Sequence, residues 1–240
     1  ITLGLLDKLK NVTGTCISPE ELLCYCYAIM ASPEYVNKFS EELLDIGPRL
    51  PITKDKILFK MGIKLGKELI WLHTFGDRFI PDGQIKGIIP PGKAKCEIGI
   101  SSKPENYPTE FSYDKAKKTI YIGDGVFRPV SKEIWEFSIS GFEVVKSWLG
   151  YRMKEASGKS SSPLDNIRPE SWTAELTEEF LNVLWILENT LKIYPKLSTF
   201  LENVLDSELF DEKELPKPTE DEKKPLKAES EPIRQKNLEF

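Results

Sequence analysis

Residues 110–122 read EFSYDKAKKTIYI. Apolar and polar side chains alternate in Glu110–Tyr113 and again in Thr119–Ile122, as they do in half-buried strands. The lysine-rich connection Asp114–Lys118 joins the two runs and predicts a β-hairpin. Because helical patterns precede and follow this hairpin, the fold class expected is α+β. It comprises a helical N-terminal third, a small antiparallel sheet in the middle, C-terminal helices and a disordered acidic tail.

Two further segments are predicted to join the sheet. Residues 95–100 alternate in the same way. Residues 133–139 read EIWEFSI, which would place Trp135, Phe137 and Ile139 on one face of a fourth strand.

Helix start signals fill the N-terminal third. Ser18 and Ser32 are each followed by Pro and Glu, which is the pattern of a cap residue, a first helical position and an acidic first turn. A third helix is predicted from about Lys54 to His73. Its Gly62 and Gly66, four residues apart, would let another backbone approach closely.

Helical spacing returns after Gly141. Phe142, Val145, Trp148 and Leu149 form an apolar stripe, and one or two long helices are predicted between Thr173 and about Leu205, with Tyr194-Pro195 as a break. We therefore expect a helical subdomain at 1–80, a sheet-plus-helix region at 81–207 and a flexible charged tail at 208–240, which is poor in large apolar residues.

Composition limits the classes of function. The 240 residues carry a net charge of -5, so a nucleic-acid site must be a local patch. No apolar run approaches the roughly 20 residues of a membrane span, and the first residues do not resemble a signal peptide. A cytoplasmic protein without a membrane partner is expected. The chain lacks an initiator Met, which is consistent with a piece of something longer.

Cysteine and histidine give little support to a metal or catalytic site. The four cysteines do not show the paired spacing of a zinc site, and we interpret them as buried reduced thiols. The single histidine, His73, ends an apolar helix without a nucleophile or carboxylate at a motif-like spacing. A structural role at the helix C-terminus is the favoured interpretation, and a catalytic role is the alternative.

Signature motifs of catalysis are absent from the sequence. It contains no phosphate-binding GxxxxGK[ST], no GxGxxG after a strand, no GxSxG and no HExxH. The Asn-Pro-Pro-aromatic motif of adenine-amino methyltransferases is also missing. We therefore expect no catalytic residues, no metal and no cofactor in this fragment.

Basic residues suggest recognition of a polyanion instead. Residues 86–132 hold nine basic residues against five acidic ones, although solvated strands and turns are often lysine-rich too. The loop 157–163, SGKSSSP, offers hydroxyls, a lysine and a flexible backbone, and an ordinary polar loop is the alternative. The candidate DNA-binding residues are Arg128, Lys132, Lys146, Tyr151, Arg152, Lys154, Lys159, Ser160, Ser161, Ser162 and Arg168. Tyr151 and Trp148 are interpreted as core residues in preference to base-stacking ones, and Trp148 and Trp172 as core anchors on either side of the loop.

Two longer segments carry a family resemblance. Residues 134–153, IWEFSISGFEVVKSWLGYRM, and 160–195, beginning SSSPLDNIRPESW, are similar to the C-terminal part of type ISP restriction-modification enzymes and related adenine-specific DNA methyltransferases. The family pattern is met at Trp135, Phe137, Ser140, Gly141, Trp148, Tyr151, Arg152, Ser162, Pro163, Leu164, Ile167, Pro169 and Trp172. The likeness spans about residues 18–205.

The resemblance implies a sequence-specific double-stranded DNA recognition module of a larger bacterial enzyme. In such enzymes the methyltransferase domain of the same chain uses S-adenosylmethionine, and nuclease modules lie further N-terminal. The alternative is a structural domain that docks on the methyltransferase core with little DNA contact. A third hypothesis is a free-standing enzyme with a pocket around His73 or a carboxylate pair.

Overall fold

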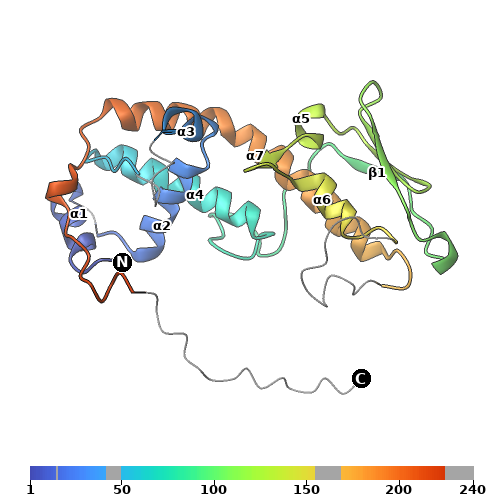
Figure 1. Cartoon of the computed structure of the whole chain (residues 1–240), viewed down its shortest axis with the longest axis horizontal. Coiled ribbons are helices and arrows are strands. Elements are labelled where there is room, and N and C mark those ends of the chain that lie inside the picture. Colours follow the sequence, from blue (N-terminus) through green and yellow to red (C-terminus); the bar gives the residue numbers. More distant parts are fainter. Residues whose placement is uncertain (15, 42–49, 155–168, 225–240) are drawn as a thin grey trace, which may run out of the picture.

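A computed structural model describes residues 1–14, 16–41, 50–154 and 169–224. The molecule is elongated, with a helical subdomain at one end and a β-sheet at the other (Figure 1). The long helix α7 (Ala174–Asp206) runs between the two ends. No helix in the described part of the chain is both long enough and apolar enough to cross a membrane.

The helical subdomain begins where the cap signals predict. Its helices are α1 (Leu5–Thr13), α2 (Pro19–Met30), α3 (Pro33–Lys38) and α4 (Lys56–His73). The Ser18 side chain accepts the amide of Glu21, whose carboxylate accepts the amide of Ser18 in return. This reciprocal cap satisfies two amides that the first helical turn leaves without a partner.

Helices α2 and α4 pack backbone against backbone, as Gly62 and Gly66 predict. A Cβ at Gly66 would lie 1.8 Å from the carbonyl oxygen of Cys24, and one at Gly62 would lie 2.6 Å from the rings of Tyr25 and Phe200. Only a residue without a side chain permits this approach.

The main sheet has four antiparallel strands. These are β1 (Lys95–Ile98), β2 (Phe111–Asp114), β3 (Thr119–Ile122) and β4 (Gly125–Arg128), in the order β1-β4-β3-β2. The predicted hairpin is confirmed, with Phe111 opposite Ile122 and Asp114 opposite Thr119. A short 3-10 turn, η2 (Pro104–Asn106), lies between β1 and β2.

The predicted fourth strand at 133–139 is wrong. Residues Lys132–Trp135 form the short helix α5, because the Ser131 hydroxyl caps the amide of Ile134. Only Ser138–Ile139 is extended, as β5, and it pairs with β6 (Phe142–Glu143) in a separate two-stranded hairpin. The main sheet takes its fourth strand from β4, which no pattern in the sequence indicated.

Helix α6 (Val144–Gly150) buries Val145 and Leu149 as predicted. Phe142, the first residue of the predicted stripe, is not part of this helix. It lies in β6, where its side chain is 54% exposed.

Tyr194-Pro195 does not break α7, which is one helix of 33 residues. Proline removes one backbone donor and crowds the preceding turn, which ordinarily kinks or ends a helix. Here Ile193 and Leu197 are buried on either side of Pro195, and this packing holds the helix together.

Two apolar cores share α7. The helical core contains Ile29, Leu69 and Phe200, and the sheet core contains Phe127, Leu149 and Phe180. Trp185 and Tyr194 of α7 pack against both. The long helix therefore couples the two ends of the molecule.

The first residues of the predicted tail lie against the helical subdomain. The amide of Lys54 donates to the Glu208 carbonyl, and the amide of Phe210 donates to the Ile52 carbonyl. A 3-10 turn, η4 (Glu212–Glu214), follows. Residues 225–240 lie outside the described part of the chain.

The four cysteines are free thiols, but they are not all buried as expected. Cys24 is buried, whereas Cys16 is exposed and Cys26 and Cys96 are half-buried. Cys16 precedes the cap of α2 in a connection that the core does not cover, so the prediction is wrong for this residue.

Candidate nucleic-acid interface

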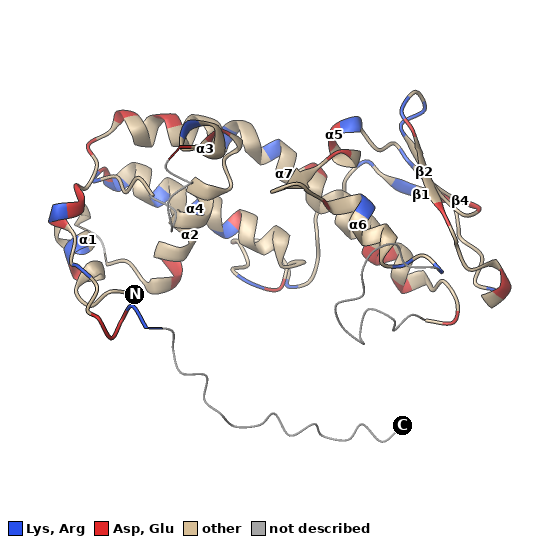
Figure 2. Cartoon of the chain, viewed as in Figure 1, with Lys and Arg blue, Asp and Glu red and all other residues tan. Residues whose placement is uncertain are grey.

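Basic side chains gather at one end of the main sheet. Arg128 ends β4 directly opposite Lys95 of β1, and the β2–β3 turn adds lysines beside them (Figure 2). The amide of Val130 donates to the Lys118 carbonyl at 2.7 Å, which holds this turn next to the start of α5. We call this group the sheet-end cluster: Lys95, Lys115, Lys117, Lys118, Arg128 and Lys132.

Carboxylates pair with only some of this cluster. Arg128 lies 2.5 Å from Glu97, Lys117 is 3.6 Å from Asp114, and Lys132 is 3.2 Å from Glu136. These exposed pairs contribute little to stability and can exchange partners.

The other three members of the sheet-end cluster form no such pair with a described residue. Lys95, Lys115 and Lys118 are exposed, and none of them lies within 4 Å of a carboxylate of the described residues, although Lys118 is close enough to Glu133 for the two charges to interact. Their ammonium groups are therefore available to an anionic partner.

A second candidate group lies on α6 and directly after it. Lys146 pairs with Glu143, and its ammonium lies 5.5 Å from the centre of the Trp135 ring. Since Lys132 and Trp135 both belong to α5, this helix brings Lys146 towards the sheet-end cluster. Tyr151 is 45% exposed at the end of α6, so its interpretation as a core residue is wrong. The backbone amide of Lys154 donates to the carbonyl of Pro108 at 2.8 Å.

Arg152 is held inside the domain more firmly than its neighbours. Its guanidinium stacks on Trp148 and lies 3.6 Å from Glu179 of α7. Burial lowers the pKa of Arg152, and the Glu179 charge opposes that effect. Trp148 also packs against Trp172 and Phe180, so both tryptophans take the core positions expected for them.

Five predicted site residues, Lys159, Ser160, Ser161, Ser162 and Arg168, lie outside the described residues. Their role in DNA binding stays a prediction. Conversely, Lys95, Lys115 and Lys118 were not among the residues predicted from the sequence. The excess of basic residues in 86–132 was the available signal, but it did not show which of them lack a carboxylate partner.

His73 has a structural role in this geometry. The Thr190 hydroxyl donates to the Ile186 carbonyl, so the ring Nε2–H of His73 donates to Thr190 at 3.0 Å. Its Nδ1 accepts from the Tyr27 hydroxyl at 2.7 Å. Burial lowers the pKa of His73, which favours the neutral ring, so its structural role rests on these two hydrogen bonds and not on a positive charge at the helix C-terminus.

A cavity of about 320 Å³ beside His73 is lined mainly by apolar side chains such as Phe137, Ile139 and Leu187. Tyr27 and Thr190 occupy both ring nitrogens, and none of the described residues that line this cavity is a Ser, a Cys or a carboxylate, so the catalytic interpretation of His73 gains no support.

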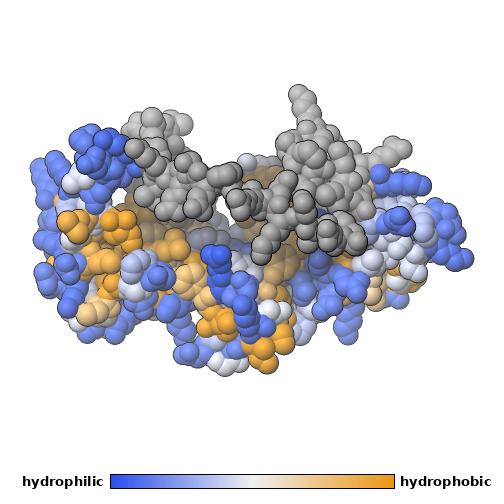
Figure 3. All heavy atoms as spheres, turned by 90° about the horizontal axis from the view of Figure 1, so that it is seen from below, coloured by the Kyte–Doolittle hydropathy of each residue, from blue (hydrophilic) through white to orange (hydrophobic). Residues whose placement is uncertain are grey.

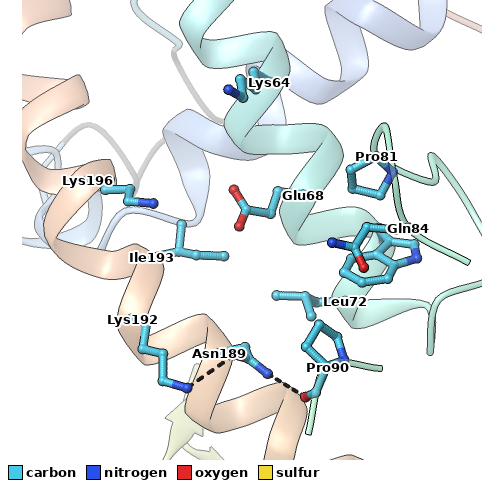
Figure 4. A pocket seen from close by; sticks show the side chains of 11 residues that line it. Lys64, Glu68, Leu72, Pro81, Gln84, Pro90, Asn189, Lys192, Ile193 and Lys196 are labelled. Atoms are coloured by element: carbon cyan, nitrogen blue, oxygen red, sulfur yellow. Dashed lines mark hydrogen bonds between the residues drawn. The ribbon is translucent and has the colours of Figure 1, made fainter. Parts of the chain in front are cut away.

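A second cavity, of about 510 Å³, lies between α4 and α7 (Figure 4). Among the described residues that line it, Glu68 is the single carboxylate, and Lys64, Lys192 and Lys196 surround it. General acid–base catalysis by paired carboxylates therefore has no basis in this cavity. Within the described ranges, no three His, Cys, Asp or Glu side chains gather as a metal site.

Comparison with known proteins identifies the family of this chain. The model of the Type ISP C-terminal specificity domain matches residues 1–183. No curated protein matches the chain significantly.

Three solved structures resemble the fold. The Type ISP restriction-modification enzyme LlaBIII bound to DNA is 20% identical, with a TM-score of 0.52, and the match covers 88% of this chain and 12% of that one. A DrdV–DNA complex is 18% identical, with a TM-score of 0.51, and the match covers 81% of this chain and 19% of that one. A nuclease-deletion mutant of the Type ISP enzyme LlaGI with a DNA substrate mimic is 17% identical, with a TM-score of 0.49, and the match covers 81% of this chain and 17% of that one. The chain thus spans less than a fifth of the length of these proteins.

Proposed function

Because this chain belongs to the Type ISP C-terminal specificity domains, we propose that it recognises a specific sequence in double-stranded DNA on behalf of a restriction-modification enzyme. The structures of LlaBIII and DrdV, which share its fold, contain DNA. The described part of the chain offers a binding surface and no catalytic constellation.

The sheet-end cluster is the observation that carries this proposal. Lys95 and Lys115 have no carboxylate partner among the described residues, and Lys118 has only the more distant charge of Glu133, although the chain as a whole is acidic. Cations grouped on such a chain create a local positive field that attracts phosphates. A duplex that binds them releases condensed counterions, which favours association.

The same proposal includes the other domains of the parent enzyme. A methyltransferase domain in the same parent chain would bind S-adenosylmethionine and modify adenine, and a nuclease module is compatible with the family. The cofactor would lie outside this fragment, and the bacterial cytoplasm would be the location.

The helical subdomain favours a second role, docking on the rest of the enzyme. Large apolar side chains are exposed there and in the loop that follows α4, including Leu3 (85%), Ile57 (74%) and Ile85 (65%). On the face seen in Figure 3, apolar patches lie over the helical end and the middle, while the sheet end is mainly hydrophilic. The two roles therefore suit opposite ends of one domain.

Fluorescence anisotropy with a labelled duplex tests the proposal. For the full chain, we expect measurable affinity at about 50 mM salt and a steep loss towards about 200 mM. Equal binding at both salt concentrations, or none at either, would contradict the proposed function.

A charge-reversed pair of variants locates the binding surface. Lys118→Glu should weaken duplex binding roughly tenfold because it replaces an attraction by a repulsion. The matched control is Lys60→Glu, an exposed lysine on α4 at the helical end, which should leave affinity within about twofold. A loss confined to the control variant would place the DNA on the helical subdomain.

A further inference from the structure

The main sheet buries one face and leaves the other open. Ile120, Ile122 and Phe127 are fully buried on the covered face, where α5, α6 and the start of α7 lie (Figure 1). Since side chains alternate along a strand, their neighbours point to the opposite side. None of the described helices covers that side.

A continuous row of side chains crosses this open side. Ile98 of β1 pairs with Val126 of β4, Val126 pairs with Tyr121 of β3, and Tyr121 pairs with Ser112 of β2. We call the row the free face: Ile98, Val126, Tyr121 and Ser112, one residue from each strand. Ile98 is 55% exposed and Ser112 is exposed, while Val126 and Tyr121 are half-buried between them.

A β-bulge places Ile98 in this row. The register shifts between Cys96 and Ile98, so Glu97 is the extra residue in β1. With regular alternation Ile98 would share the covered face with Cys96, but the bulge turns it outward. Bulges re-aim side chains near functional sites, and an isoleucine turned towards water is costly unless a partner covers it.

Charge indicates which partner fits the free face. Arg128 lies two residues after Val126 on β4 and therefore on the same face, with Lys95 directly opposite it. Lys118 directly precedes β3, at the same end of the sheet. A short apolar and hydroxyl row next to a basic cluster matches base edges flanked by phosphates, whereas an apolar protein surface would leave the ammonium group of Lys95 without a partner and Arg128 with Glu97 alone.

We propose that the free face enters the major groove of the duplex and reads base edges; this inference rests on the proposed function. The major groove admits a two-stranded ribbon, and the central strands β3 and β4 present Tyr121 and Val126. Val126 and Ile98 would contact thymine methyl groups, and the hydroxyls of Tyr121 and Ser112 would bond base edges. The sheet-end cluster would hold the adjacent phosphates.

Selection from a duplex library with a random central window provides the test. The full chain should enrich a sequence, and its affinity is then compared for the selected and a scrambled duplex. Val126→Thr and Tyr121→Phe should each reduce that discrimination roughly tenfold, because each changes one base contact. Affinity for the scrambled duplex and its salt dependence should stay unchanged, since phosphate contacts are retained.

Controls separate base reading from other effects. Val36→Thr makes the same change at a 57% exposed valine on α3 and should keep full discrimination. Lys118→Gln should weaken both duplexes equally. If Val126→Thr lowers the unfolding temperature, Ile98→Thr, at a more exposed position, makes the decisive comparison.

The outcomes are distinct. Full discrimination in the Val126, Tyr121 and Ile98 variants would overturn the inference and leave the proposed function intact. Duplex binding by the native chain without enrichment of any sequence would also overturn it. Absence of any duplex binding would defeat the proposed function, and the inference with it.

Discussion

The guanidinium of Arg152 lies 3.7 Å from the centre of the Trp148 ring, one helical turn back along the chain. Its Nη1 donates to the Trp148 carbonyl oxygen at 3.2 Å, and its Nη2 lies 3.6 Å from Glu179. Arg152 therefore ties the end of α6 to α7. Charge reversal at this residue would disturb folding and DNA binding together, which makes it a poor probe of recognition.

Arg152→Ala should lower the free energy of unfolding by about 1–2 kcal/mol, because stacking, packing and the Glu179 pair are lost together. Arg152→Lys should recover little of this, since an ammonium lacks the planar fork. Urea denaturation measures both. Lys154→Ala is the control, because that side chain is exposed and makes no ion pair with a described residue. An unchanged midpoint for Arg152→Ala would contradict the prediction.

Gly66→Ala should destabilise the helical subdomain by about 3 kcal/mol or more. The new Cβ would lie 1.8 Å from a backbone carbonyl oxygen, that of Cys24, and backbone cannot move aside as a flexible side chain can. Thermal unfolding gives the comparison with Gly99→Ala, where a Cβ meets nothing within 4 Å and the change should stay within about 0.5 kcal/mol. Equal stability of the two variants would show that α2 and α4 are not held in this contact.

Local signals in the sequence predicted the elements that local chemistry determines. The Ser18 cap and the β2–β3 hairpin depend on neighbours within a few positions. Gly62 and Gly66 of α4 are different, because their spacing indicated a close approach but not that α2 makes it. The strand predicted at residues 133–139 was wrong because two local signals competed there. The alternation of these residues satisfied a strand pattern, but the Ser131 cap two positions earlier competed with it and prevailed.

Features that depend on distant contacts could not be predicted in this way. Pro195 looked like a break because the packing of Ile193 and Leu197 in the helical core is not visible in sequence. The sheet-end cluster is a similar case. Strand register determines which basic side chains lie within ion-pair distance of a carboxylate. Glu97 of β1, for example, reaches Arg128 of β4.

Protonation of His73 should lower the free energy of unfolding as the pH falls. Burial lowers its pKa in the folded protein below the ordinary value of 6.5, so the unfolded chain binds a proton first as the pH falls. The favourable contribution is complete above about pH 6.5, declines as the pH falls towards the lower folded pKa, and is lost below it.

His73→Gln should flatten this part of the profile of unfolding free energy against pH. His73 is the only histidine in the chain, so no second imidazole obscures the comparison. Chemical denaturation between about pH 8 and pH 5 measures the slope for both proteins. An identical slope in the variant would mean that carboxylates, not His73, cause the loss.

Glu188 should anchor the connection between the two ends of the molecule. It is 9% exposed on α7, and its carboxylate accepts the amide of Lys93 at 2.7 Å and lies 3.1 Å from Lys192. Glu188→Ala should cost about 2 kcal/mol because the Lys93 amide loses its acceptor in a partly buried position, whereas Glu188→Gln keeps an acceptor and should cost less than half of that. Amide hydrogen exchange at Lys93 should accelerate in the alanine variant alone. Glu202→Ala, an exposed change on the same helix, should affect neither measurement, and equal behaviour of the two alanine variants would show that the segment before β1 is held by other contacts.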